Sequence, residues 1–139
     1  MSEAEVELIR KVYALGDLLK LAPEEIDRAF RDYLDDQFEF RLPPDYPEGQ
    51  PVFRGRSGVE DLIAMLRDAW AEWQFEPQRF IDAGEQVVVP VRIVGKGEAS
   101  GVPVEIEGSH VWTVRDGRAL SMHSYRDHAA ALEAAGVSE

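Results

Sequence analysis

Apolar residues recur three or four positions apart in three segments of the first half of the chain, which is the spacing of a helix with one buried face. A capping box formed by Ser2 and Glu5 marks the start of the first segment, and Pro23 suits the first turn of the second. The third segment, residues 58–73, follows another capping box at Ser57 and Glu60 and has the cleanest apolar stripe. The pattern therefore predicts three helices, the first two joined by a tight turn. The three stripes contain Leu8, Ile9, Val12, Leu15 and Leu19; Ile26, Ala29, Phe30, Tyr33 and Leu34; and Val59, Leu62, Ile63, Leu66, Trp70 and Trp73.

Alternation with a period of two predicts strands elsewhere. Residues 37–42 place Phe38, Phe40 and Leu42 on one face of a half-buried strand, and a loop rich in proline follows up to residue 50. Two further strands are expected at residues 79–83 and 86–95. Pro90 predicts that the second of these lies at an edge or contains a bulge.

The strongest local signal is a long hairpin over residues 104–127. Asp116-Gly117 separates two alternating runs, and this dipeptide favours a type I′ turn, in which both central residues have positive φ. His110, Trp112 and Val114 then share one face of the hairpin, and Val111 and Thr113 share the other. A last helix over residues 129–135 is expected between an Asp127 cap and Gly136.

The order of these elements predicts a single α+β domain over residues 1–139. Helices come first and strands later, which argues against an alternating α/β fold. Three apolar helix stripes need a cover, and one strongly bent antiparallel sheet wrapped around them would provide it. Such a cone leaves a cavity at its open end.

Charge and composition exclude several function classes. The net charge of −12 repels nucleic acid and anionic membranes. The chain has no cysteine, so disulfides and thiolate metal sites are excluded. The acidic first residues contain no apolar signal-peptide core, and a cytoplasmic protein is expected. The spacing of His110, His123 and His128 does not support a metal site, and no phosphate-binding loop indicates a nucleotide cofactor.

Short motifs in the expected order resemble the SnoaL-like branch of the nuclear transport factor 2-like superfamily. They are YLDD at 33–36, FRG at 53–55, WTVRDGR at 112–118, YRD at 125–127 and ALEAAG at 131–136, and together they span nearly the whole chain. The resemblance implies a conical α+β barrel with a deep apolar pocket. It also implies a homodimer formed through the outer face of the sheet, where Val111 and Thr113 would be costly to leave wet.

The same resemblance suggests site residues. The tyrosine that ketosteroid isomerases carry on their first helix matches Tyr13, and their hydrogen-bond-donating aspartate falls on His110. Their proton-abstracting aspartate falls on Arg41 or Phe40, neither of which can act as a base. The catalytic aspartate of polyketide cyclases falls on Ser124, with His123 beside it.

Two functions are consistent with these residues. The first is a non-catalytic protein that binds a small, largely apolar molecule in the cone, and the missing carboxylate favours it. The alternative is an isomerase, cyclase or dehydratase that acts on a carbonyl compound without a cofactor, with His110 and Tyr13 as acid/base groups or hydrogen-bond donors. In either case Phe40, Phe53, Trp70, Trp112 and Ser124 are the expected ligand-binding residues.

Overall fold

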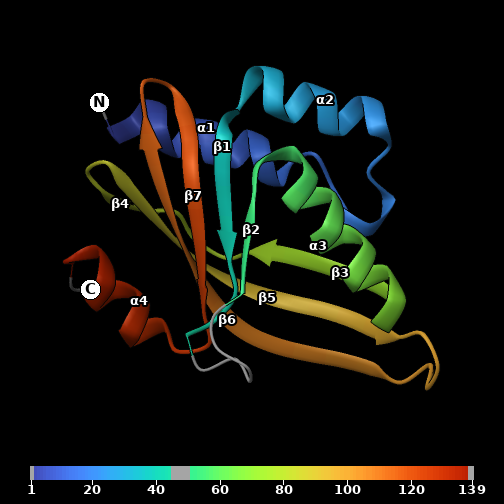
Figure 1. The fold of residues 1–139 in the computed structure, drawn as a ribbon. Coiled ribbons are helices and arrows are strands. Elements are labelled where there is room, and N and C mark those ends of the chain that lie inside the picture. The colour runs from blue at the N-terminus through green and yellow to red at the C-terminus, as the bar shows by residue number, and fades with distance from the viewer. Residues whose placement is uncertain (1, 45–50, 138–139) are drawn as a thin grey trace.

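A computed structural model describes residues 2–44 and 51–137 of the chain (Figure 1). Most of its helices come before most of its strands. In order they are α1 (Ser2–Tyr13), the 3-10 turn η1 (Leu18–Lys20), α2 (Pro23–Asp32), β1 (Leu34–Arg41), β2 (Val52–Arg54), α3 (Gly55–Ala69), β3 (Trp70–Pro77), β4 (Ile81–Ala83), β5 (Gln86–Gly97), β6 (Pro103–Arg115), β7 (Arg118–Tyr125) and α4 (His128–Ala135). In the part of the chain that the structure describes, none of the helices is long and apolar enough to cross a bilayer.

The strands form one curved sheet in the order β2-β1-β7-β6-β5-β3, and β4 extends the pairing of β5. The predicted α+β cone is confirmed. Its sheet is mixed, because β1 and β7 run parallel while the other pairs are antiparallel. The Ala119 N–H donates to the Tyr33 carbonyl at 2.9 Å, next to the start of this parallel pairing.

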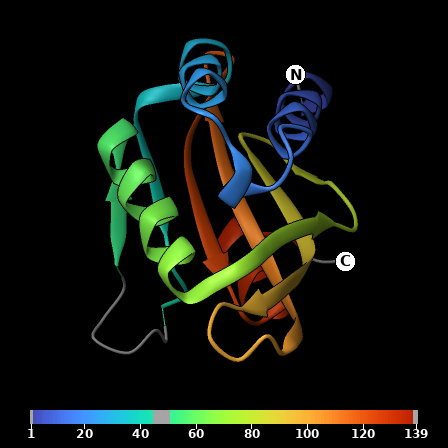
Figure 2. The ribbon, with the colours of Figure 1, turned by 90° about the vertical axis from the view of Figure 1, so that its right-hand side faces the viewer.

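Helices cover both faces of the sheet. α1, α2 and α3 lie on the concave side, and α4 lies on the opposite side (Figures 1 and 2). Ala131 of α4 packs on Val88 and Val111, so Val111 is only 4% exposed. Val111 does lie on the outer face, as the alternation predicted, but the last helix of the same chain covers it, so it is not available for the expected dimer contact. Thr113 is half-buried and shares a hydrogen bond with Gln86.

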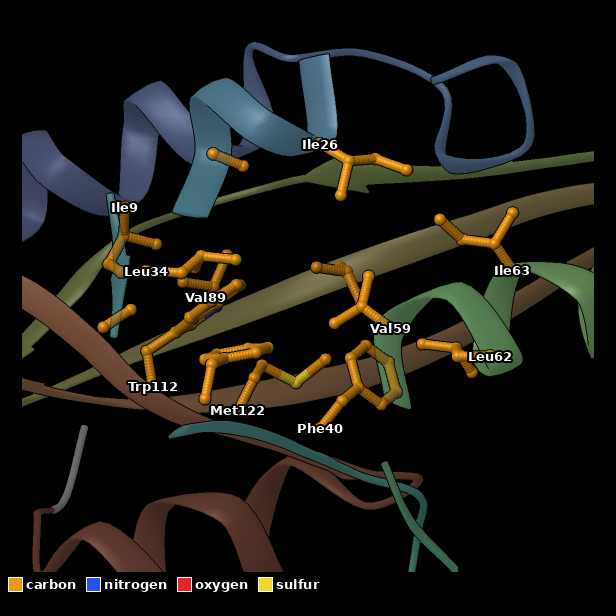
Figure 3. Packing of buried hydrophobic residues seen from close by; sticks show 14 of the residues in the cluster. Ile9, Ile26, Leu34, Phe40, Val59, Leu62, Ile63, Val89, Trp112 and Met122 are labelled. Carbon is orange, nitrogen blue, oxygen red and sulfur yellow. The ribbon is translucent and has the colours of Figure 1, made fainter. Parts of the chain in front are cut away.

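The main core lies between the concave face and the three helices. Figure 3 shows side chains from the helices directed toward side chains from the strands. The labelled helix residues are Ile9, Ile26, Val59, Leu62 and Ile63, and the labelled strand residues are Leu34, Phe40, Val89, Trp112 and Met122.

The first two helices are shorter than their stripes predicted. α1 ends at Tyr13, and Leu15 and Leu19 belong to the connection to α2. Gly16 has φ of +99° in this connection, and Asp17 Oδ1 then accepts a hydrogen bond from the Leu19 N–H, which starts η1. The predicted tight turn is thus a longer link, in which Leu19 is buried and Leu15, Leu18 and Leu21 pack against the core.

The third helix was placed wrongly at both ends. α3 begins at Gly55, so Ser57 lies inside it rather than at its cap, and it ends at Ala69. Trp70 and Trp73, predicted on the helix, lie on β3, which pairs with β5 along its length. The backbone hydrogen bonds of this pairing outweigh the helical spacing of the two tryptophans.

The later elements follow their local signals closely. Asp116 and Gly117 have φ of +53° and +74°, which confirms the predicted hairpin turn. Asp127 Oδ1 caps α4 by accepting from the Ala129 N–H, and Gly136 closes the helix with φ of +72°. The loop expected after Leu42 falls largely on residues 45–50, outside the described residues.

Pro90 is neither at an edge nor in a bulge. It lies inside β5 in an unbroken register with β6. On the side of β5 that faces β3 and β4, Pro90 lies between the end of the pairing with β3 and the start of the pairing with β4. Its carbonyl there accepts a hydrogen bond from the Gln78 N–H at 2.8 Å. The N–H and C=O of a strand residue point to the same neighbour. The missing N–H of Pro90 therefore costs no hydrogen bond to β6.

Candidate functional site

Three polar side chains meet on the concave face of the sheet. His110 and Trp112 lie on the inward face of β6, and Tyr13 is the last residue of α1. The Tyr13 Oη atom lies 2.6 Å from His110 Nδ1, and the Trp112 Nε1–H donates to the same oxygen at 2.9 Å. His110 is fully buried, so any hydrogen-bond partner of its ring nitrogens must lie inside the cone.

Burial fixes the protons of this trio. It raises the pKa of the Tyr13 hydroxyl, against a smaller lowering by Trp112, and the phenol keeps its proton. It lowers the pKa of His110 to about 3, so the imidazole is neutral. We assign the Tyr13 proton to the bond with His110 Nδ1, because a proton on Nδ1 would leave both the Tyr13 O–H and His110 Nε2 without a partner among the described residues. The proton of His110 then lies on Nε2.

His110 Nε2 is the unused end of this chain of hydrogen bonds. It is buried and has no hydrogen-bond partner among the residues that the structure describes. A buried N–H without an acceptor costs about 1–3 kcal/mol, a cost that an acceptor on a ligand would remove. The direction of the chain, from Trp112 through Tyr13 to His110, makes Nε2–H a donor rather than a base.

A cavity of about 110 Å³ lies beside this trio, enclosed by α1, α2, their connection and the concave face; we call it the inner cavity. Its wall is apolar apart from Tyr13, His110 and Trp112, and none of its described lining residues is a carboxylate or a cation. An engineered cavity of roughly 150 Å³ binds benzene, so the inner cavity suits a group of about one ring.

A second hollow of about 340 Å³ adjoins the first; we call it the outer cavity. Phe40, Leu62 and Phe75 line both cavities, and Trp70 and Trp73 line the outer one. Together the two hollows reach the size of ordinary small-molecule sites, which span about 300–1,000 Å³.

Most of the residues predicted for the site line one of these cavities. Tyr13, His110 and Trp112 line the inner cavity, Trp70 and Ser124 line the outer one, and Phe40 lines both. Phe53 of β2 lines neither, and it packs on the first turns of α3 instead.

The matches with catalytic aspartates give no carboxylate in the site. Phe40 faces the cone, whereas Arg41 points to the other face and pairs with Glu39 at 2.8 Å. The Arg41 hydrogen bond is the main reason that the pKa of Glu39 is lowered. Of the two residues at the cyclase aspartate position, Ser124 faces the cone, and His123 lies on the outer side, opposite Val111. Burial, reinforced by the Arg41 charge, lowers the pKa of His123.

Several aromatic residues that line the cavities were not predicted to bind ligand, and Phe38 and Phe75 are the two that contact the trio. Phe38 stacks on Trp112 with ring centroids 5.9 Å apart, and Phe75 meets His110 edge to face at 4.7 Å. The alternation of β1 already placed Phe38 on the same face as Phe40. Phe75 could have been found only if residues 70–77 had been recognised as a strand.

The described residues offer no metal centre. Across residues 2–44 and 51–137, no three side chains of histidine, cysteine, aspartate or glutamate cluster closely enough to hold an ion. His128 lies away from the cone, where its Nδ1 is 2.8 Å from the Ser109 hydroxyl.

Comparison with known proteins agrees with this architecture. A family model for the SnoaL-like domain matches residues 22–122. The sequence has no match among curated proteins.

Solved structures match almost the whole chain. An NTF2-like protein of unknown function from Burkholderia pseudomallei K96243 is 21% identical, with a TM-score of 0.71, over 96% of this chain and 97% of that one. TerC, co-crystallised with polyporic acid, is 23% identical, with a TM-score of 0.71, over 96% and 98%. A candidate SnoaL-like polyketide cyclase from Jannaschia sp. CCS1 is 17% identical, with a TM-score of 0.73, over 100% and 96%. At these identities the likeness establishes the fold alone.

Proposed function

The chain belongs to the SnoaL-like domain family, and we propose that it binds a small, largely apolar molecule in the cone, held by one hydrogen bond from His110. The observation that carries this proposal is the buried, unpartnered Nε2 atom in the wall of an otherwise apolar cavity. A ligand that places a carbonyl or ether oxygen at Nε2 would complete the chain of hydrogen bonds that begins at Trp112. Apolar burial would supply most of the binding free energy, and this single donor would fix the orientation.

The protonation of the trio supports binding over acid/base catalysis. A general base works best with a pKa near the working pH, whereas the pKa of His110 is lowered to about 3. No carboxylate among the described lining residues of the inner cavity can take its place. Ser124, at the position of the cyclase aspartate, is not an acid at neutral pH.

A test of the proposal uses 2-acetylnaphthalene, a neutral apolar ketone, titrated into the protein while tryptophan fluorescence is recorded. Saturable binding is expected, and His110→Phe should weaken it about tenfold, because the variant removes one hydrogen bond to the carbonyl. His123→Phe makes the same change on the outer face of β7 and should bind like the wild type. Lack of binding to the wild type, or equal binding to both variants, would contradict the proposal.

The alternative function, an isomerase, cyclase or dehydratase, is favoured by the buried Tyr13–His110 pair itself. A neutral imidazole N–H can polarise a carbonyl and stabilise a developing enolate without being charged. In this reading Tyr13 holds the tautomer of His110, and the base comes from the substrate or from water.

Proton exchange distinguishes the two functions. If the site promotes enolisation, the methyl protons of 2-acetylnaphthalene in heavy water should exchange for deuterium faster with the protein than without it. His110→Phe should abolish the acceleration, as followed by proton NMR. An exchange rate that the wild-type protein does not change would leave binding as the function.

We extend the proposal to self-association as a homodimer. Val102, at the turn before β6, is 56% exposed, and Ile106 on β6 is 38% exposed. A contact between two copies would remove these side chains from water.

A further inference from the structure

A second buried donor lies close to His110. Among the described residues, the buried side-chain nitrogen and oxygen atoms without a hydrogen-bond partner are His110 Nε2 and Trp73 Nε1. Both are N–H groups, since an indole nitrogen can only donate and His110 carries its proton on Nε2. Unpaired buried polar atoms are rare in folded proteins, and each needs an explanation.

The two donors lie on either side of one aromatic ring. Trp73 and Phe75 occupy alternate positions of β3 and face the cone together. The Phe75 ring meets the Trp73 ring edge to face, with centroids 6.1 Å apart, and meets the His110 ring in the same manner at 4.7 Å. Because Phe75 lines both cavities, it forms part of the partition between them.

Two glycines make room around this partition. Gly95 of β5 lies opposite Trp73, and a Cβ atom there would come within 3.2 Å of the Trp73 ring and 3.3 Å of the Trp70 ring. Gly108 precedes His110 on the same face of β6 and lines the outer cavity, so the floor of that cavity has no side chain at this point. Gly95 thereby lets the two indoles pack against the sheet, while Gly108 and His110, two positions apart on β6, line the outer and the inner cavity respectively.

We propose that the inner and outer cavities form one elongated site for a flat, neutral molecule with two hydrogen-bond acceptors, one for His110 Nε2–H and the other for Trp73 Nε1–H. This inference rests on the proposed binding function and adds the ligand class, an extended aromatic dicarbonyl or a compound of similar shape. Phe75 turns aside to let the ligand pass between the two cavities. We expect a neutral ligand because both donors are uncharged and no charged residue lines the inner cavity. The outer cavity is lined by Glu107 and Arg126, whose opposite charges require no net charge on the ligand.

Three naphthalenes of matched shape test the proposal. 2,6-Diacetylnaphthalene has a carbonyl at each end, 2-acetylnaphthalene has one, and 2-ethylnaphthalene has none. Each buried donor that gains an acceptor should strengthen binding about tenfold, so affinity should rise stepwise from the ethyl to the monoacetyl to the diacetyl compound. Dissociation constants from tryptophan fluorescence or calorimetry give the two ratios.

Single substitutions assign each step to one donor. Trp73→Phe keeps a ring at β3 but removes the N–H, and it should abolish the preference for the diacetyl over the monoacetyl compound. His123→Phe, on the outer face of β7 and outside both cavities, should leave that ratio unchanged. His110→Phe should likewise cost the diacetyl compound about tenfold while Trp73 still binds one carbonyl.

The outcomes separate this inference from the broader binding function. If the monoacetyl compound binds better than the ethyl compound but no worse than the diacetyl compound, the second donor site is wrong and binding at His110 stands. If Trp73→Phe keeps the wild-type ratio, the assignment to Trp73 is overturned. If none of the three compounds binds to the wild-type protein, the proposed binding function fails as well.

Discussion

At the scale of single residues, the candidate site depends on how burial distributes three protons. Trp112 can only donate, Tyr13 both accepts and donates, and His110 accepts at Nδ1. The hydrogen bond made by each group therefore determines whether the next group donates or accepts, and the last N–H of the series has no acceptor among the described residues. A hydrogen-bond chain of this kind gives a ligand one defined point of attachment without placing any charge in an apolar cavity.

The buried histidine should make folding stability depend on pH. An ordinary histidine in the unfolded chain titrates near pH 6.5, whereas the pKa of His110 in the folded protein is about 3. Between these values the unfolded chain binds a proton that the folded protein does not. Stability is therefore lost as the pH falls from 6.5 toward 3, by up to about 1.4 kcal/mol per pH unit.

We expect the wild-type protein to lose about 2 kcal/mol more than His110→Phe between about pH 7 and about pH 5. Urea unfolding at several pH values measures this difference. The other titrating groups, His123 and Glu39 included, are present in both proteins, so the comparison isolates His110. Equal losses in the two proteins would show that His110 is accessible to protons in the folded state.

At the scale of elements, short sequence motifs correctly predicted those features that depend on neighbouring residues, such as the hairpin between β6 and β7. Asp116 and Gly117 define a turn through their own backbone preferences, and the alternation that follows from this hairpin placed His110 and Trp112 inside the cone. The pairing of His110 with Tyr13, 97 positions earlier in the chain, came from the family resemblance, since no local pattern brings helix and strand together.

The boundary between α3 and β3 shows why the rest of the site escaped prediction. Leu62, Leu66, Trp70 and Trp73 have helical spacing, yet the chain becomes extended at Trp70. Pairing with β5, whose partner residues lie 14 to 27 positions further along the chain, makes this segment a strand, and Gly95 accommodates its two indoles. The positions of Trp73 and Phe75 in the cavity follow from that non-local register.

The close approach of β2 to α3 gives a prediction about Gly58. Alanine usually stabilises a helix relative to glycine by about 1 kcal/mol. A Cβ atom at Gly58, however, would lie 2.7 Å from the Phe53 carbonyl carbon and 3.1 Å from its Cα. We therefore expect Gly58→Ala to destabilise the protein by about 1–3 kcal/mol, because the backbone of β2 or α3 must shift.

Thermal or urea unfolding of Gly58→Ala measures this effect. Ala64 is exposed on the same helix, and Ala64→Gly should cost about 1 kcal/mol through helix propensity alone. Helix propensity alone predicts that Gly58→Ala stabilises the protein and Ala64→Gly destabilises it. If both variants are less stable than the wild type, the loss in Gly58→Ala comes from the steric clash. A Gly58→Ala protein more stable than the wild type would refute the close approach.

At the scale of the whole molecule, the cavities and the ion pairs around Arg92 lie on different sides of the sheet. The concave side of the sheet holds the apolar cavities, while the edge of the outer face next to β3 carries ion pairs such as Arg92 with Glu76 and Glu105. α4 covers the apolar part of the outer face. The exposed side chains of Val102 and of Ile106, which borders the outer cavity, are therefore a better basis for the proposed dimer than Val111 and Thr113.

The proposed homodimer should be sensitive to ionic strength. Each copy carries a net charge of −12, so two copies repel each other over the screening length, which is about 30 Å at 0.01 M salt and about 10 Å at 0.1 M. Light scattering at micromolar concentration should therefore give a dimer mass at moderate salt and a weaker dimer at low salt.

Ile106→Glu should yield monomers, whereas Val52→Glu, on a strand separated from β6 by β1 and β7, should not. A monomer mass at every salt concentration would contradict self-association, and a dimer that strengthens at low salt would show that attraction between complementary charged patches outweighs the net repulsion.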